Sequence, residues 1–247
     1  MIHYWKADCI RITKRIPRVL IVLAILIVYG ILLVRASGKD NWNSVVFVAD
    51  FINYVGLAPI FFGIVELAVV FSDDLKAKNM QVGIGMGLTR GQVVRTKYLD
   101  IAYMAFVDFA CLAVSQIILA YVTGAALQGS QLWDVMAASV IGWISTLAYT
   151  AVCVFLILLL QNAAIGILLY IVLEVGLIYT LLGKLFDLAL IRSLHLEKFL
   201  LTTMLGKLQA QLMVGKLDCG SAVGVIVYIA IFYVIAVSVF RRRELEF

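Results

Sequence analysis

The chain has 247 residues, of which 64% are hydrophobic and only 14% charged, and its formal net charge is +5. Soluble domains are roughly 45–50% apolar and about 25% charged, and one as apolar as this chain would expose large apolar patches and aggregate. The composition therefore excludes an ordinary soluble enzyme, a disordered chain and a nucleic-acid-binding domain, and it indicates an integral membrane protein with several spans.

Residues 2–16 have the pattern of an amphipathic helix. Apolar residues recur every three or four positions on one face, and basic residues cover much of the rest. The apolar set is Ile2, Trp5, Cys9, Ile12 and Ile16, and the basic set is Lys6, Arg11, Lys14 and Arg15. Such a helix would lie in the membrane interface with Trp5 at headgroup depth. A plain basic anchor and a mechanical role both fit this pattern.

Six stretches are long and apolar enough to cross a bilayer, because a spanning helix needs roughly 20 mostly apolar residues. They are residues 17–36, 45–71, 98–123, 132–160, 163–183 and 221–240. Their apolar runs are continuous, whereas the strands of a membrane barrel alternate over about 10 residues. The sequence therefore predicts an all-α polytopic membrane protein, with residues 1–247 forming a single transmembrane domain.

The basic residues predict the orientation of these spans. The N-terminal segment, the loop after the second span and the C-terminal tail together hold 13 of the 20 Lys and Arg residues, and the opposite side holds 7. Basic residues gather in cytoplasmic loops of membrane proteins. We therefore expect both termini and the loop 72–97 to be cytoplasmic.

The loop 72–97 combines an alternating acidic and basic stretch, residues 72–78, with a glycine-punctuated apolar stretch, residues 83–91. Thr89 is placed to cap a helix that runs toward Lys97. The glycines do not form a phosphate loop, because no Gly-x4-Gly-Lys-Ser/Thr occurs in the chain. The loop is suited to docking a soluble partner, and a merely solvated loop is the alternative.

The long segment 184–220 would face outside, and its apolar and polar residues alternate with helical periodicity. This pattern predicts one or two amphipathic helices that lie on, or dip into, the outer leaflet.

Acidic residues in the apolar runs are the most unusual feature of the spans. Glu66 is predicted to lie near the inner end of its span, whereas Asp108 and Glu174 are predicted near the midplane. No Lys or Arg is expected at that depth, and a charged acid there costs at least about 2.5–3.5 kcal/mol. Two solutions remain open. The acids are protonated and hydrogen-bonded to neighbours, or they line a polar pathway for a cationic or amphipathic substrate.

Catalytic motifs are missing from the sequence. The two histidines, His3 and His195, fall near opposite faces of the predicted bundle. No Gly-x-Ser-x-Gly, His-Glu-x-x-His or Gly-x-Gly-Asp motif lies in a span. The four cysteines do not have metal-ligand spacing, so we expect neither a metal site nor catalytic residues.

Taken together, these parts resemble the ABC-2 type permeases, the membrane subunits of ATP-binding-cassette exporters. The architecture is similar along the whole chain, from the interfacial helix through the six spans to the long outer segment between spans 5 and 6. Two local stretches also resemble the family: Phe71-Ser-Asp-Asp-Leu-Lys76 followed by Gly87-Leu-Thr-Arg90, and the basic ending Phe240-Arg-Arg-Arg-Glu244. The glycine-rich residues 83–87 depart from it, because the family has a more polar run there. The small size is similar to permeases of peptide-antibiotic export and immunity systems.

The resemblance implies a bacterial plasma-membrane permease that moves an amphipathic or hydrophobic substrate, with peptides favoured. A cytoplasmic ATPase dimer would bind ATP and Mg, and a second permease subunit, identical or a sister chain, would complete the pathway among membrane lipids. The coupling residues would be Asp73, Asp74, Lys76, Gly87, Leu88, Thr89 and Arg90, and the substrate pathway would include Glu66, Asp108 and Glu174.

Two other classes of protein compete with this interpretation. An ion-coupled carrier, or a solute-binding membrane subunit, would use Asp108 and Glu174 as proton or solute sites without ATP. An intramembrane enzyme lacks support because its catalytic motifs are missing.

Overall fold

The computed structural model describes residues 2–38, 42–76, 79–186 and 196–242. In chain order its elements are α1 (Ile2–Thr13), α2 (Ile16–Ser37), α3 (Ser44–Val55), α4 (Ala58–Leu67), the π-helix η1 (Ala68–Ser72), α5 (Asp73–Lys76), α6 (Asn79–Gly85), α7 (Arg90–Val122), α8 (Gly129–Leu160), α9 (Ala163–Glu174), α10 (Leu177–Phe186), the 3-10 helix η2 (Leu196–Phe199), α12 (Leu201–Met213) and α13 (Cys219–Arg242). All the regular structure in these ranges is helical, which confirms the predicted class for the described part of the chain.

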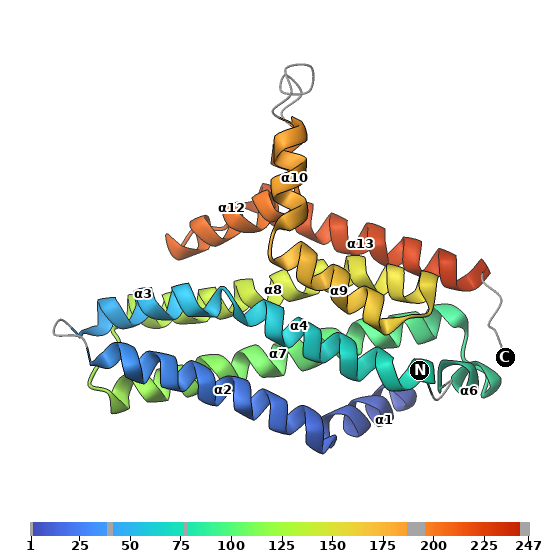
Figure 1. The fold of residues 1–247 in the computed structure, drawn as a ribbon, viewed down its shortest axis with the longest axis horizontal. Coiled ribbons are helices and arrows are strands. Elements are labelled where there is room, and N and C mark those ends of the chain that lie inside the picture. The colour runs from blue at the N-terminus through green and yellow to red at the C-terminus, as the bar shows by residue number, and fades with distance from the viewer. Residues whose placement is uncertain (1, 39–41, 77–78, 187–195, 243–247) are drawn as a thin grey trace.

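Five helices are long and apolar enough to cross a membrane: Ile16–Ser37, Ser44–Ser72, Arg90–Val122, Gly129–Leu160 and Cys219–Arg242. They run along the long axis of a bundle, whereas α10 points away from it (Figure 1). The chain thus has the helical character of a membrane protein.

The predicted span 163–183 is not one straight helix. α9 and the segment Leu177–Lys184 meet at an angle of 59°, so the pair is either a broken span or a re-entrant loop. The break contains Gly176, whose φ of +78° is a left-handed conformation that favours glycine. Apolar periodicity alone does not reveal such a break, because the residues on both sides remain apolar.

The segment Ser44–Ser72 also departs from a regular α-helix. Pro59 lies in the first turn of α4, where it cannot donate a backbone hydrogen bond, and η1 follows as a π-helix. The Tyr170 hydroxyl donates a 2.6 Å hydrogen bond to the Pro59 carbonyl. A side chain from α9 therefore satisfies a backbone acceptor near this irregular turn, as membrane helices require.

α7 begins at a strong helix-start signal. The Thr89 side chain accepts from the Gln92 amide, and the Gln92 side chain accepts from the Thr89 amide, which forms a capping box. This confirms the predicted cap at Thr89. The helix then continues for 33 residues, so its first turns extend beyond the predicted span 98–123.

α12 packs with one face against α8 and α13, and the buried residues of that face are Leu201, Leu205 and Leu208. The Trp133 indole of α8 donates to the Leu212 carbonyl over 3.2 Å, and the Tyr228 hydroxyl of α13 donates to the Phe199 carbonyl over 2.7 Å. α12 therefore runs antiparallel to the first half of α13. Residues 187–195 of the predicted outer segment lie outside the described residues.

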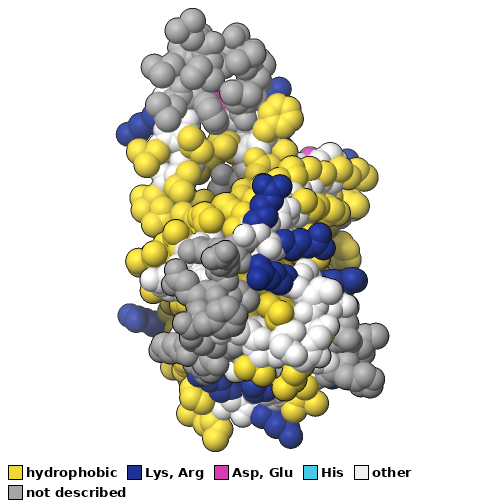
Figure 2. Space-filling view, turned by 90° about the vertical axis from the view of Figure 1, so that its right-hand side faces the viewer, with side chains coloured by type: hydrophobic (Ala, Val, Ile, Leu, Met, Phe, Trp, Pro, Cys, Tyr) yellow, Lys and Arg dark blue, Asp and Glu magenta, His cyan; other side chains and the backbone are white. Residues whose placement is uncertain are grey.

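α1 and the last turn of α13 lie at the same end of the bundle, close to α6 (Figure 1). Lys and Arg side chains stand out on this face of the molecule (Figure 2). Arg90, at the start of α7, donates a 2.9 Å hydrogen bond to the Arg241 carbonyl, so the base of α7 holds the end of α13. We refer to this region as the basic end.

Close helix packing depends on small residues. A Cβ atom added to Gly63 would lie 2.1 Å from Cζ of Tyr170, whose side chain is fully buried. Gly63 therefore allows α9 to approach α4 closely enough for Tyr170 to reach Pro59.

We expect Gly63→Ala to lower the stability of the purified protein by about 1–3 kcal/mol, because the added methyl group must displace a buried ring. Thermal unfolding in detergent measures this effect. Gly30→Ala is the matched control, since a Cβ atom there meets nothing within 4 Å. Equal melting temperatures for the two variants would contradict the packing described here.

Candidate functional site

A cluster of charges, four of its five residues buried, joins three segments at the basic end. We call it the Lys97 cluster, and it consists of Asp8, Arg11, Asp74, Lys97 and Asp100. The Lys97 ammonium contacts Asp8 at 2.6 Å and Asp74 at shorter range, and it lies 3.9 Å from Asp100. Arg11 bridges Asp8 and Asp74, at 2.8 Å from Asp74. The cluster thereby ties α1, α5 and α7 together.

The carboxylates and the ammonium of the Lys97 cluster are removed from water, whereas the Arg11 side chain is 44% exposed. Lys97 is 0% exposed and Asp74 only 1%. Buried charges are tolerated only when opposite charges and hydrogen bonds compensate for the lost hydration. At Asp8, burial alone would raise the carboxyl pKa, but Lys97 and Arg11 outweigh it and hold the pKa below its ordinary value. Asp8 is therefore an anion at neutral pH and attracts both cations.

Cys9 adds a polar contact to this cluster. Its thiol donates to Oδ1 of Asp100 over 3.3 Å, and burial together with that hydrogen bond raises the thiol pKa to about 12. The side chain is 8% exposed. Cys9 is therefore a protonated donor at neutral pH rather than a reactive nucleophile.

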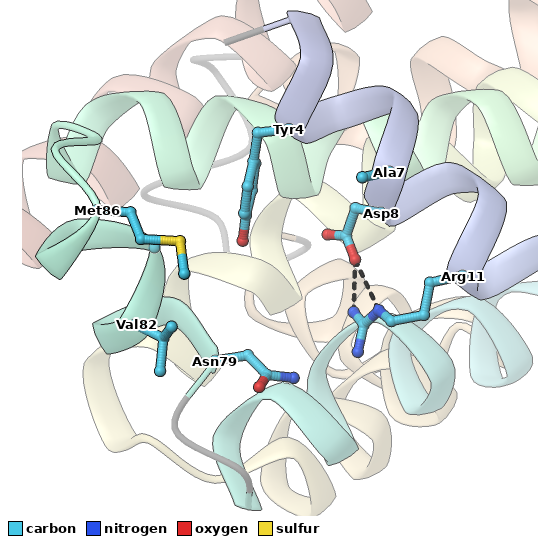
Figure 3. A pocket seen from close by; sticks show the side chains of 8 residues that line it. Tyr4, Ala7, Asp8, Arg11, Asn79, Val82 and Met86 are labelled. Atoms are coloured by element: carbon cyan, nitrogen blue, oxygen red, sulfur yellow. Dashed lines mark hydrogen bonds and ion pairs between the residues drawn. The ribbon is translucent and has the colours of Figure 1, made fainter.

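A pocket of about 280 Å³ opens between α1 and α6, beside the Lys97 cluster. In Figure 3, Tyr4 extends from α1 toward α6, whereas Val82 and Met86 approach from the α6 side. Val82 is 52% exposed and Met86 79%, so apolar side chains rim a pocket whose inner edge carries the ion pair of Asp8 and Arg11. An exposed apolar rim with a fixed charge pair is suited to holding another protein segment.

The coupling residues expected from the sequence fall into different environments. Asp74 is buried in the Lys97 cluster, so its carboxylate acts within the chain. Thr89 caps α7, and Arg90 bonds the end of α13. The Leu88 amide donates to the Gly83 carbonyl, and Gly87 lies in that turn. The side chains of Asp73 and Lys76 lie outside the described residues.

A second cluster of buried charges lies among the spanning helices. We call it the Arg18 cluster, and it consists of Arg18, Glu66 and Asp108. The guanidinium lies 2.9 Å from Glu66 and 2.9 Å from both carboxylate oxygens of Asp108. Arg18 is 4% exposed, Glu66 0% and Asp108 1%. Two of the three expected pathway acids therefore share one cation.

The expectation that no basic residue reaches these acids is wrong. Arg18 lies in the first turn of α2, near the end of its span, but its long side chain extends toward the bundle interior. Counting depth by residue number ignores the several ångströms that an arginine side chain adds. The Arg18 cluster has one cation for two carboxylates, and Oε2 of Glu66 lacks a hydrogen-bond partner among the described residues. It therefore carries one negative charge, or one proton neutralises it.

Glu174 is separate from both clusters. It ends α9, just before the break at Gly176, and one carboxylate oxygen accepts a 3.2 Å hydrogen bond from Ser145 of α8. The other oxygen is buried and has no partner among the described residues.

An aromatic pocket of about 190 Å³ lies where α9 ends, and its wall includes Leu173, Tyr149, Tyr228 and Phe232. Glu174 does not line this pocket but follows Leu173, which does, and aromatic rings near a carboxyl group favour a cationic group. Glu174 therefore remains the candidate for a contact with a substrate.

Sequence reasoning missed the residues that organise both clusters, namely Arg18, Asp8, Arg11 and the role of Lys97. A signal was present in part, because Asp8 and Arg11, like Lys97 and Asp100, are oppositely charged residues three positions apart. The described residues contain no group of three or more His, Cys, Asp or Glu side chains that could hold a metal ion.

The chain matches no model of a known protein family, and it matches no curated protein in sequence. The two charge clusters and the pockets beside them are therefore the features of the molecule that point to its function.

We expect Arg18→Gln to destabilise the protein by about 3–5 kcal/mol, because it leaves two buried carboxyl groups without their cation. The triple variant Arg18→Gln, Glu66→Gln, Asp108→Asn should regain most of this loss, since it also removes the acids. Thermal unfolding in detergent measures both. Arg35→Gln, at the exposed far end of α2, is the control, and an Arg18 variant as stable as this control would contradict the buried ion pairs.

We expect Cys9 to react with N-ethylmaleimide at pH 8 at least about 100-fold more slowly than Cys219, which is exposed. A thiol whose pKa is about 12 is almost entirely protonated at pH 8, and the thiolate is the reactive form. Single-cysteine variants followed by mass spectrometry give the two rates. Comparable rates would show that Cys9 is accessible and not bound to Asp100.

Proposed function

We propose that this chain is the permease subunit of an ATP-driven exporter of the ABC-2 type, with six spans and with both ends on the cytoplasmic side of a bacterial plasma membrane. The Lys97 cluster carries the proposal, because it joins α1, α5 and the base of α7 into one unit at the basic end. A unit of this kind can transmit a push from a soluble partner into a spanning helix.

The orientation is supported by the basic end itself. Basic residues favour the cytoplasmic side of a membrane, and Lys and Arg side chains gather where α1, α6 and the end of α13 meet (Figure 2). The pocket between α1 and α6 then faces the cytoplasm, where an ATPase dimer that binds ATP and Mg would dock. The six-span topology counts α9 and α10 as one broken span.

The substrate would pass between this chain and a second permease subunit, identical or a sister chain. Glu66 and Asp108 are held by Arg18, so Glu174 is the acid best placed to meet a substrate. Its unpartnered oxygen and the neighbouring aromatic pocket favour an amphipathic molecule with a positive charge, such as a membrane-active peptide.

An ion-coupled carrier is the second candidate function. The Arg18 cluster favours it, because one cation facing two carboxyl groups leaves room for one exchangeable proton. Such a carrier would work without an ATPase, and its transport would follow the proton gradient.

Co-expression with a cytoplasmic ABC ATPase that lacks membrane spans tests the proposal. We expect the two proteins to co-purify, and we expect Val82→Asp with Met86→Asp to reduce the recovered ATPase at least about tenfold, because both side chains rim the pocket between α1 and α6. Val214→Asp is the matched control, since Val214 is 70% exposed and follows α12 at the other end of the bundle.

Two results would overturn the proposal. One is unchanged recovery of the ATPase with the double variant. The other is transport by the purified chain alone, driven by a proton gradient without ATP, which would favour the ion-coupled carrier.

A further inference from the structure

A second pocket lies on another side of α1, where this helix meets α7. It has a volume of about 450 Å³, and its wall includes Trp5, Lys6, Ile10, Lys14 and Tyr103. Tyr4 and Asp8, by contrast, line the pocket beside α6. α1 therefore carries Asp8 and Arg11 on the side that bonds Asp74 and Lys97, and a basic, aromatic surface on the side that meets Tyr103, further along α7.

The two lysines of this second pocket are unpaired. Neither Lys6 nor Lys14 has an acidic partner among the described residues, although Asp8 and Arg11 on the same helix are fully paired. The lysines are eight positions apart, about 12 Å along the helix axis at 1.5 Å per residue. A multivalent anion placed between them would supply the missing negative charge.

The rest of the pocket wall is apolar and aromatic. The rings of Trp5 and Tyr103 pack edge to face, with their centroids 6.2 Å apart. Ile10 is 55% exposed and Tyr103 45%. The Trp5 indole N–H is buried and has no acceptor among the described residues. Trp and Tyr side chains favour the boundary between lipid headgroups and acyl chains, where one end is apolar and the other polar.

We propose that this pocket binds an anionic phospholipid of the surrounding bilayer, with its phosphate between Lys6 and Lys14 and its glycerol and upper acyl chains against Trp5, Ile10 and Tyr103. The charges complement one another, and basic pockets beside spanning helices hold anionic headgroups. A lipid ester or phosphate oxygen is also an acceptor that the Trp5 N–H can reach by a small rotation. The proposal requires only that the chain is embedded in a membrane, and it is independent of ATP.

Bound lipid would act on the same helix as the Lys97 cluster. α1 is fixed to α7 on one side through Asp8 and Lys97, and the lipid would fix its other side. The anionic lipid would therefore hold α1 in the membrane interface and help to keep the pocket between α1 and α6 in place.

Quenching of tryptophan fluorescence tests the proposal on the full chain in nanodiscs. Brominated phosphatidylglycerol and brominated phosphatidylcholine are added in turn, and the Trp5 contribution is the difference between the protein and its Trp5→Phe variant. We expect phosphatidylglycerol to quench Trp5 at about tenfold lower mole fraction than phosphatidylcholine, because each lysine near an anionic headgroup contributes a several-fold preference.

Paired lysine variants distinguish binding in this pocket from the attraction of anionic lipid to basic residues anywhere on the protein. Lys6→Gln with Lys14→Gln should reduce the preference to below about threefold, and Lys6→Arg with Lys14→Arg should retain it. Lys207→Gln with Lys216→Gln, which removes the same charge from α12 and the turn after it, should leave the preference unchanged. Size-exclusion elution and helical content establish that each variant is folded.

Three results would overturn the proposal. One is a preference for phosphatidylglycerol over phosphatidylcholine below about threefold in the unaltered protein, and another is a preference that the Lys6 and Lys14 glutamine variant retains. Either result would mean that Trp5 contacts bilayer lipid without selecting an anionic headgroup through these two lysines. Loss of Trp5 quenching on adding inorganic phosphate, at an ionic strength matched with chloride, would assign the pocket to free phosphate.

Discussion

The cost of placing charge inside an apolar bundle is the constraint on which this structure depends. An ionised side chain removed from water is tolerated only beside a partner of opposite charge. The chain meets this condition twice, in the Lys97 cluster and in the Arg18 cluster, and the three segments that supply the charges are the same in both. The N-terminal segment, α1 with α2, contributes Asp8, Arg11 and Arg18. The segment from α3 to α5 contributes Glu66 and Asp74. The third segment is α7, which contributes Lys97, Asp100 and Asp108.

Ion pairs therefore hold each of these three segments at two positions along the bundle, one in the Lys97 cluster and one in the Arg18 cluster. Lys97 and Asp108 are 11 residues apart on α7, about 16 Å along its axis. The turn between α1 and α2 lies between Arg11 and Arg18, and η1 lies between Glu66 and Asp74. Ion pairs on both sides thus hold the geometry of these two irregular points, the turn between α1 and α2 and the π-helix η1. The half of the molecule formed by α8 to α13 is joined differently, mainly by apolar contacts and by hydrogen bonds such as that of Glu174 with Ser145.

The sequence was sufficient for features that depend on composition and local pattern. Continuous apolar runs predicted the helices, and Thr89 with its downstream residues predicted the start of α7. Features that depend on long side chains or on a single backbone angle were not predictable in this way. Arg18 reaches Glu66 and Asp108 because its side chain crosses several ångströms, and the break at Gly176 lies within an uninterrupted apolar run. Arg11 bonds Asp74, 63 residues away, and Lys97 bonds Asp8, 89 residues away, so no local pattern could reveal these two contacts.

The molecule thus has a half linked by charges, α1 to α7, and a half linked mainly by apolar contacts, α8 to α13. This difference indicates how a movement at the basic end would be transmitted. A force on α6 would reach α5 and the Lys97 cluster, and the two levels of ion pairs would carry it along α7 with little bending. α7 passes it to α8 through contacts such as the 3.0 Å hydrogen bond from the Trp143 indole to the Ala102 carbonyl. Beyond α8 the contacts are mainly apolar and adjust more easily, because they have no fixed direction. The aromatic pocket and the break at Gly176 lie in that more adaptable half, so a displacement of the charge-linked half against it would change the surroundings of Glu174 first.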